Sequence, residues 1–158
     1  MRVLLDTNVL ARAAQVGHPQ HEAAAKAVAA MPNRGLTTVL VPQNLYEFWV
    51  VCTRPLGENG LGMEVGAARV MIEELRKAFQ VMDETPAFLP TWESLVAQHD
   101  VRGKSAHDAR LVAAMKVHGI TMLLTFNKQH FVRYAGVSIM TPDEAVGTQS
   151  GPRSVGRA

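Results

Sequence analysis

The stretch MRVLLDTNVL, residues 1–10, decides the fold of this chain. Its apolar run Val3–Leu5 is typical of a strand buried on both faces, and the polar residues Asp6–Asn8 interrupt it before a helical pattern begins. Asp6 therefore follows a predicted buried strand, which is where open α/β sheets bind their ligands. Asp, Thr and Asn are also preferred helix N-cap residues. These ten residues alone leave open whether Asp6 caps a helix or binds a ligand.

Length and composition predict one compact domain. The chain has 158 residues, of which 47% are hydrophobic and 19% are charged, enough for a sizeable core. The single cysteine, Cys52, excludes an internal disulfide, and its apolar neighbours predict a buried side chain rather than a nucleophile. The net charge of +2 comes from Arg153 and Arg157, since the rest of the chain has 14 basic and 14 acidic residues. A local patch must therefore bind any anionic partner.

The sequence carries no sign of membrane insertion or export. No apolar stretch approaches the roughly 18 to 20 residues of a membrane span, and the first apolar run ends at Asp6, too early for a signal peptide. We therefore expect a cytoplasmic protein without membrane contact. We expect a folded domain over residues 1–146 and a disordered tail over residues 147–158, which read GTQSGPRSVGRA.

Strands and helices are predicted to alternate along the chain. The predicted strands cover residues 3–5, 36–41, 80–82, 121–125 and 137–140. The predicted helices cover residues 9–14, 19–31, 43–54, 63–79, 88–99 and 105–118, with a short helix within 126–134. This alternation predicts an α/β fold in three layers, with a mainly parallel sheet of four to five strands between helices.

Two further acidic residues lie on predicted helices. Glu47 lies in the apolar segment QNLYEFWVV, where a carboxylate needs a partner because burying it alone costs several kcal/mol. Glu47 therefore lies either at the rim of the core or buried with a partner, and its alternative role is a residue at the core edge paired with an arginine such as Arg54. Asp108 lies early in the helix of HDARLVAAM. Its alternative role is a capping box with Ser105, worth about 1 kcal/mol.

A fourth polar residue, Asn127, follows the predicted strand TMLLT much as Asp6 follows the first strand. Its alternative role is a turn or N-cap residue. A doubly wound sheet can bring all four residues to one crevice. Three carboxylates about 4 Å apart repel by about 1 kcal/mol per pair in water and by about 4 kcal/mol at an effective dielectric of 20. Such a cluster needs protons or a cation, and oxygen ligands select Mg²⁺ or Mn²⁺.

Four segments in this order, LLDTNVL, QNLYEFWVV, HDARLVAAM and LLTFNKQHF, resemble the PIN-domain family over residues 1–143. The resemblance implies a metal-dependent, mostly ribonucleolytic fold with a central parallel sheet. It places Asp6, Glu47 and Asp108 among the metal-binding acids of the family, with Asn8 and Thr125 as polar support.

The fourth acid of the family falls on Asn127, so this chain departs from the usual Asp. An amide oxygen can still ligate a metal or orient a water, but it supplies no negative charge. A second Mg²⁺ should therefore bind weakly, and the sequence leaves open whether one metal ion or two take part.

The resemblance also implies a function. We expect a Mg²⁺- or Mn²⁺-dependent ribonuclease whose catalytic residues are Asp6, Glu47, Asp108 and Asn127. Many small bacterial members are VapC-type toxins, so we expect the toxin of a type II toxin–antitoxin pair, an antitoxin as protein partner, and a homodimer formed through the helix at residues 63–79. Ordinary core packing is the alternative role for that helix.

Four basic residues flank the motifs and are candidates for RNA phosphate contacts: Arg54, Lys104, Arg110 and Lys128. A solvated basic rim is the alternative for each of them.

The sequence bears on three other classes of protein. A haloacid-dehalogenase-type phosphatase needs a second Asp two positions after the first, where this chain has Asn8. A receiver-like domain needs a pair of acids after its first strand, and Asp6 has no acidic neighbour. The serious competitor is a PIN-like RNA-binding or scaffold protein with little or no nuclease activity because of Asn127.

Overall fold

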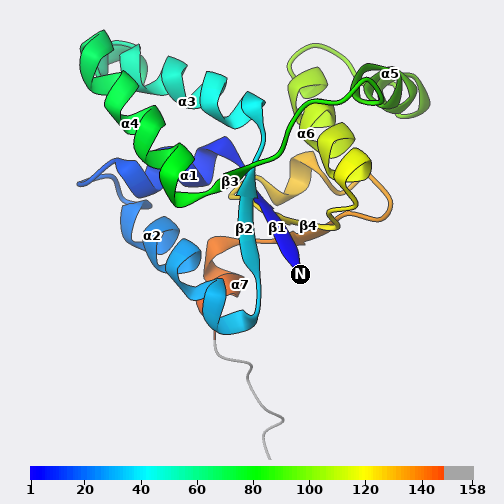
Figure 1. Cartoon of the computed structure of the whole chain (residues 1–158), viewed down its shortest axis with the longest axis horizontal. Coiled ribbons are helices and arrows are strands. Elements are labelled where there is room, and N and C mark those ends of the chain that lie inside the picture. Colours follow the sequence, from blue (N-terminus) through cyan, green and yellow to red (C-terminus); the bar gives the residue numbers. More distant parts are fainter. Residues whose placement is uncertain (148–158) are drawn as a thin grey trace, which may run out of the picture.

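A five-stranded, wholly parallel sheet lies at the centre of the computed structural model, which describes residues 1–147 (Figure 1). The strands lie side by side in the order β3-β2-β1-β4-β5. Their bounds are Arg2–Leu5 for β1, Thr37–Leu40 for β2, Gln80–Val81 for β3, Met122–Leu124 for β4 and Ser138–Met140 for β5. The predicted α/β class and parallel sheet are confirmed, and the strand number is five.

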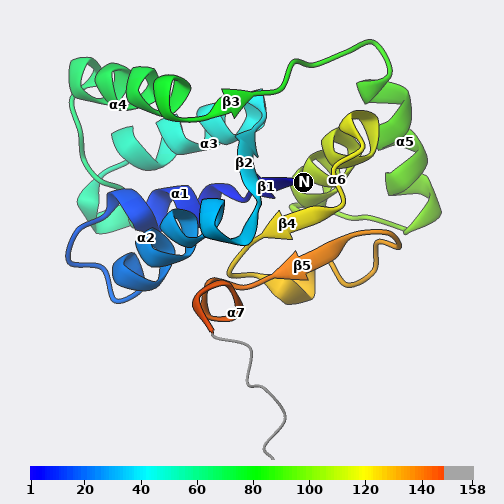
Figure 2. The ribbon, with the colours of Figure 1, turned by 60° about the horizontal axis from the view of Figure 1, so that its bottom comes forward.

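Helices cover both faces of the sheet, which confirms the three predicted layers (Figure 2). One face packs against α1 (Thr7–Ala14), α2 (His21–Ala30), α3 (Pro42–Thr53), α4 (Val65–Ala78) and α7 (Pro142–Val146). The other face packs against α5 (Phe88–Gln98) and α6 (Ser105–His118). Short 3-10 turns at Pro32–Arg34, Leu56–Glu58 and Lys128–His130 complete the elements.

The central strand shows why its sequence is apolar without interruption. Val3 and Leu5 point into the core under α1 to α4, while Leu4 points into the core under α5 and α6, and all three are fully buried. Successive residues of a strand face opposite sides of a sheet. A strand covered on both faces therefore needs an apolar residue at every position.

The chain reverses its direction of travel across the sheet at β1. After β1 it forms β2 and β3 on one side, and it then returns to form β4 and β5 on the other. Leu4 pairs with Val39 of β2 and with Leu123 of β4, both in parallel register. In such sheets the ligand crevice opens at the carboxyl ends of the strands beside this reversal. The fold therefore places the ends of β1 and β4 at one crevice.

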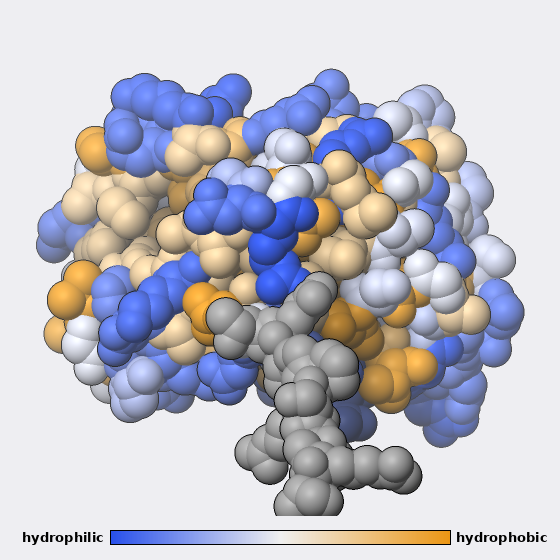
Figure 3. All heavy atoms as spheres, turned by 90° about the horizontal axis from the view of Figure 1, so that it is seen from below, coloured by the Kyte–Doolittle hydropathy of each residue, from blue (hydrophilic) through white to orange (hydrophobic). Residues whose placement is uncertain are grey.

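That carboxyl edge lies toward the top of Figure 1, where α3 and α6 begin. The opposite side, seen from below in Figure 3, mixes hydrophilic and hydrophobic residues over its visible surface. Within residues 1–147, no helix combines the length and the apolar character that crossing a membrane requires.

The structure differs from the predicted elements near the carboxyl end. Residues 142–146 form α7, which we did not predict. The predicted short helix within 126–134 is only the 3-10 turn Lys128–His130. The predicted tail lies, from residue 148 on, outside the described residues.

The structure decides the cap of α6 and the burial of Cys52. The proposed capping box of Ser105 with Asp108 is wrong, because Lys104 is the N-cap residue of α6 and no side chain caps that helix. Cys52 is fully buried in the core, as predicted. Helix α4 uses Ala68 and three partly buried residues for core packing, while Val65 and Val70 stay exposed.

Candidate functional site

Asp6 lies directly after β1 and is held by β4. Its backbone N–H donates to the carbonyl of Leu124 at 2.9 Å. Its Oδ2 accepts from Thr125 Oγ1 at 2.6 Å and from Asn8 Nδ2 at 3.0 Å. Asp6 is the N-cap residue of α1 by position, but its side chain makes no capping hydrogen bond. Long-range contacts, rather than the cap, therefore fix this carboxylate at the edge of the sheet.

Glu47 projects from α3 with both carboxylate oxygens held. Thr7 Oγ1 donates to Oε2 at 2.7 Å, and Gln43 Nε2 donates to Oε1 at 2.7 Å. The alternative pairing with Arg54 is wrong, because Arg54 Nη2 donates to the carbonyl of Asn59. Two neutral donors thus orient Glu47 without neutralising its charge.

The beginning of α3 explains how Glu47 reaches the end of β1. Pro42 starts the helix, and Asn44 Oδ1 accepts from the backbone N–H of Val41 at 2.8 Å. The fully buried Asn44 also donates to the carbonyl of Leu5 at 2.9 Å. Gln43, one turn before Glu47, also donates to the carbonyl of His107 at 2.9 Å and so ties α3 to α6.

Asp108 and Asn127 complete the set of predicted residues. Asp108 lies in the first turn of α6, with its Oδ2 3.3 Å from Nδ1 of His130. Asn127 follows β4, and its backbone N–H donates to Thr125 Oγ1 at 2.9 Å. It is the N-cap residue of the 3-10 turn by position, again without a capping side-chain bond.

The charges of the acids affect one another. Burial raises the pKa of Asp6 to about 6, the hydrogen bond from Thr125 opposes this rise, and the charges of Glu47 and Asp108 add to it. Burial likewise raises the pKa of Asp108, His130 opposes that rise, and Glu47 adds to it. The acids are therefore close enough to repel one another within one partly desolvated site.

All four predicted residues, Asp6, Glu47, Asp108 and Asn127, line one cavity of about 940 Å³ at the carboxyl edge of the sheet. Asn8 also lines it, whereas the fully buried Thr125 supports Asp6 from behind.

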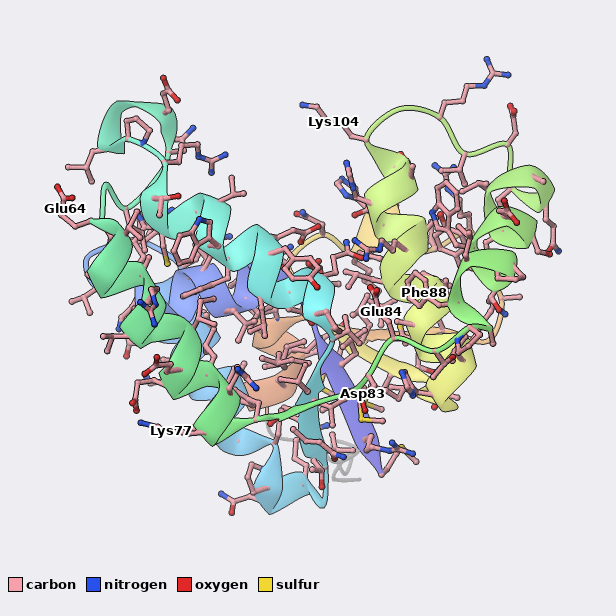
Figure 4. All side chains as sticks on the ribbon, turned by 45° about the horizontal axis from the view of Figure 1, so that its top comes forward. Glu64, Lys77, Asp83, Glu84, Phe88 and Lys104 are labelled. Carbon is pink, nitrogen blue, oxygen red and sulfur yellow. The ribbon has the colours of Figure 1, made fainter. Side chains whose placement is uncertain are left out.

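The predicted basic residues divide into two groups. Arg54, Lys104 and Arg110 line the cavity, whereas Lys128 forms an ion pair with Glu144 at 2.9 Å and does not. In Figure 4, Lys104 extends from the beginning of α6 toward the side of α3.

Arg110 is neutralised by its surroundings. It pairs with Glu84 and lies 5.5 Å from the ring centre of Phe88, both of which Figure 4 places beside α6.

The donor set of the cavity suits a hard cation, but its side chains do not enclose one. Carboxylate and amide oxygens are the ligands that Mg²⁺ and Mn²⁺ prefer. Within residues 1–147, no group of three His, Cys, Asp or Glu side chains stands together so as to hold an ion. The fold supplies acids of the right chemistry around one cavity, and a complete ligand set requires their side chains to move or other oxygens to join.

Sequence reasoning missed four residues of the site: Thr7, Gln43, His130 and Arg12. The signal for Gln43 was its place four residues before Glu47, which puts both on one helix face. Thr7, His130 and Arg12 carried no comparable signal, because only the packing of the fold brings Thr7 to Glu47, His130 to Asp108 and Arg12 to the cavity.

Comparison with known proteins gives a family and a set of similar folds. A sequence model described as the PIN domain matches residues 3–137. No curated protein matches the sequence.

Three solved structures illustrate the likeness of fold. VapBC2 from Rickettsia felis bound to a DNA fragment from their promoter has 12% identity and a TM-score of 0.66, and the match covers 89% of this chain and 98% of that one. VapC20 of Mycobacterium tuberculosis, described as a sarcin-ricin loop cleaving toxin, has 22% identity and a TM-score of 0.64 over 81% of this chain and 92% of that one. A toxin–antitoxin complex from Klebsiella pneumoniae has 20% identity and a TM-score of 0.59, and the match covers 89% of this chain and 97% of that one.

Proposed function

Because the match over residues 3–137 makes this chain a member of the PIN-domain family, we propose that it is a metal-dependent endoribonuclease that hydrolyses RNA phosphodiester bonds. The observation that carries this proposal is the convergence of Asp6, Glu47 and Asp108 on one cavity at the reversal of the sheet. Burial, with repulsion from Glu47 and Asp108 added, raises the pKa of Asp6 to about 6, so the cluster favours a neutralising cation.

The ion would be Mg²⁺ or Mn²⁺, held by Asp6, Asp108 and Glu47. Once bound, it would neutralise negative charge on the phosphate and acidify the attacking water. Asn127 offers an amide oxygen at the same cavity but adds no charge, so we propose one well-held ion rather than two.

The residues of the chain have separate roles in this proposal. Asp6 is held in place by Thr125 and Asn8, so its carboxylate needs little reorganisation on binding an ion. Glu47, with both oxygens oriented by Thr7 and Gln43, would orient the attacking water and accept its proton. Unlike these groups, Asn127 is exposed at the rim, where it would contact the phosphate or the water.

The test is cleavage of single-stranded and structured RNA by the purified protein. We expect cleavage in Mg²⁺ or Mn²⁺ and none in excess EDTA. Asp6→Asn should reduce the rate by about a hundredfold or more, the usual effect of removing a preorganised charge. Glu93→Gln, which removes an exposed acid of α5 away from the cavity, should cleave like the wild type. Equal activity of Asp6→Asn and the wild type would refute the proposal.

We also propose that the protein is the toxin of a type II pair with an antitoxin partner. The similar folds include complexes described as VapBC and as toxin–antitoxin, which supports this role. Induced expression in a bacterial host should arrest growth, and Asp6→Asn should abolish the arrest.

We also propose that the protein forms a homodimer through α4, which is supported by the exposed side chains of Val65 and Val70. Light scattering of the purified protein measures it.

A second function has one observation in its favour. Asn127 stands where the family has an acid, and within residues 1–147 no three acidic or histidine side chains already surround an ion. A PIN-like RNA-binding or scaffold protein fits this arrangement. RNA binding without cleavage at millimolar Mn²⁺ would favour it over the nuclease.

A further inference from the structure

The cavity extends well beyond the acids. Its volume of about 940 Å³ far exceeds the roughly 30 Å³ that one water occupies in the liquid. Part of its lining comes from the later turns of α1 and α3, namely Ala11, Arg12, Val50, Val51 and Arg54. This end of the cavity has no role in the proposed hydrolysis.

Helical spacing places the two arginines at one end of the cavity. Arg54 is the C-cap residue of α3, seven positions after Glu47, so the two residues lie about 10 Å apart along the helix axis and on nearly the same face. Asn8 and Arg12 are four residues apart on α1, which separates them by about 6 Å along its axis. The two helices contact each other, and both run from the sheet toward the same side of the molecule (Figures 1 and 2).

Neither arginine is neutralised within the described residues. Arg12 Nη1 donates to the amide oxygen of Gln15 at 2.9 Å, and Arg54 Nη2 donates to the carbonyl of Asn59 at 3.1 Å. No carboxylate of residues 1–147 forms an ion pair with either of them. Arg54 Nε is buried and has no hydrogen-bond partner among residues 1–147.

The surroundings strengthen the attraction of these charges for an anion. Both arginines are half-buried, and Ala11 and Val51 beside them are buried or half-buried apolar residues. Charges act more strongly where apolar groups displace water. This end of the cavity therefore presents donors and positive charge to an anion, whereas the acids at the other end repel one.

We propose that Arg12 and Arg54 form a phosphate-binding subsite for the RNA strand. It takes a phosphate other than the one held at Asp6 and Glu47, since the two positions lie about 10 Å apart along the axis of α3. The subsite deepens the proposed ribonuclease function and rests on it for the identity of the ligand. An acidic segment of a protein partner is the competing occupant, and the test separates the two.

The experiment measures binding of a fluorescent single-stranded oligoribonucleotide in EDTA, where cleavage plays no part. Arg12→Gln and Arg54→Gln should each weaken binding by about tenfold, the usual effect of losing a charged hydrogen bond. Each should also lower the slope of log affinity against log salt by about 0.7, the value for one phosphate contact of a single strand. Arg69→Gln, which removes an exposed charge of α4 outside the cavity, is the matched control.

A chemical change in the RNA locates the contact. Replacing single phosphates by neutral methylphosphonates should weaken binding to the wild type at one position near the cleaved bond. The same replacement should have no further effect on Arg54→Gln. Arg54→Lys should restore most of the salt slope, which distinguishes lost charge from a damaged fold, and circular dichroism checks the fold of every variant.

The outcomes separate this subsite from the nuclease. If no RNA is cleaved but the arginine variants bind RNA more weakly than Arg69→Gln, the subsite stands and the nuclease fails. If RNA is cleaved but Arg12→Gln and Arg54→Gln bind it like the control, the subsite is refuted and an acidic protein segment becomes the favoured occupant. Failure of the wild type to bind RNA also refutes it.

Discussion

Asp6 is a buried carboxylate, 8% exposed, that faces two other acids across the cavity. Burial raises its pKa from 3.8 to about 6, while the hydrogen bonds from Thr125 and Asn8 only partly oppose this. The folded protein therefore keeps a proton on Asp6 over a range of pH in which the unfolded chain has already lost it. Its stability must fall as the pH rises through this range.

The first prediction concerns Asp6→Asn in the absence of divalent metal. A shift of about two pKa units corresponds to about 3 kcal/mol, which the wild type loses between about pH 4 and pH 7. The variant has no charge to bury, so it should be more stable than the wild type by up to that amount at pH 8. Urea unfolding in EDTA at several pH values measures this. If the free energies of unfolding of the two proteins differed by the same amount at pH 5 and at pH 8, the prediction would be contradicted.

The second prediction concerns Gln43, which is only 4% exposed and connects Glu47 with the backbone of His107. Gln43→Leu keeps the size of the side chain but removes both donations. It should cost about 1 to 3 kcal/mol of stability, because the part-buried carboxylate of Glu47 loses one of its two donors. It should also lower kcat while changing KM little, because the carboxylate of Glu47 loses its orientation.

A double-mutant cycle separates these effects. In a Glu47→Ala background, Gln43→Leu should lower the cleavage rate no further, since the carboxylate that it orients is absent. Rate losses that simply add would show that Gln43 acts independently of Glu47. Gln43→Met also removes the donor but has a different apolar shape. It should behave like Gln43→Leu if the lost hydrogen bonds, and not the shape of leucine, cause the effect.

At the scale of elements, the smallest helix shows what a local pattern can specify. Thr141 Oγ1 accepts from the backbone N–H of Glu144 at 3.3 Å, and Glu144 Oε2 accepts from that of Thr141 at 2.8 Å. Pro142 occupies the first turn. This Thr-Pro-x-Glu pattern is a capping box, and it was readable in the sequence. The reciprocal bonds let α7 cover the sheet with Ala145, although the helix has five residues.

The third prediction follows from this cap. Thr141→Ala removes the acceptor for the N–H of Glu144 and should destabilise the protein by about 1 kcal/mol. Thr141→Ser keeps the hydroxyl and should stay near the wild type. Urea unfolding measures both, and equal stabilities of the two variants would argue against the cap.

Helices α3 and α6 show the limit of such patterns. The sequence predicted both helices well, since each has apolar residues at suitable spacing and a clear end at Arg54 or Gly119. It suggested a capping box at Ser105 that does not form, because Asp108 faces the cavity and His130 instead. A helix start that borders a functional site can use its polar residues for contacts across the fold.

At the scale of the whole molecule, the strand order decides the site. Because β1 pairs with both β2 and β4, the polar residues after β1 and β4 meet at one edge. Helices α3 and α6, which follow β2 and precede β4, bring Glu47 and Asp108 to the same edge. An ion bound there contacts several elements at once, so its binding should stabilise the entire fold.

The fourth prediction uses this coupling. Mn²⁺ at 100 times its dissociation constant should stabilise the wild type by about 2.7 kcal/mol, measured as a shift of Tm. Asn127→Asp adds a charge at the cavity and should tighten ion binding in calorimetry. Asn33→Asp adds the same charge in the Pro32–Arg34 turn before β2, away from the cavity, and is the control. Identical affinity and stoichiometry of the two variants would contradict the role of Asn127.

The sequence by itself determined the alternation of strands and helices along most of the chain, the parallel sheet and the three layers, although it missed α7. Those features depend on local periodicity, because a strand such as Val3–Leu5 that is buried on both faces must be apolar throughout. It also supplied Asp6, Glu47, Asp108 and Asn127 as candidates.

Only the tertiary structure decided how these side chains are held. The bond from Thr7 to Glu47, the bond from Gln43 to His107 and the contact of His130 with Asp108 join residues on different elements, and the two arginines reach the cavity from α1 and from the end of α3. Such contacts depend on the packing of α1, α3 and α6 around the end of β1, which no local pattern encodes.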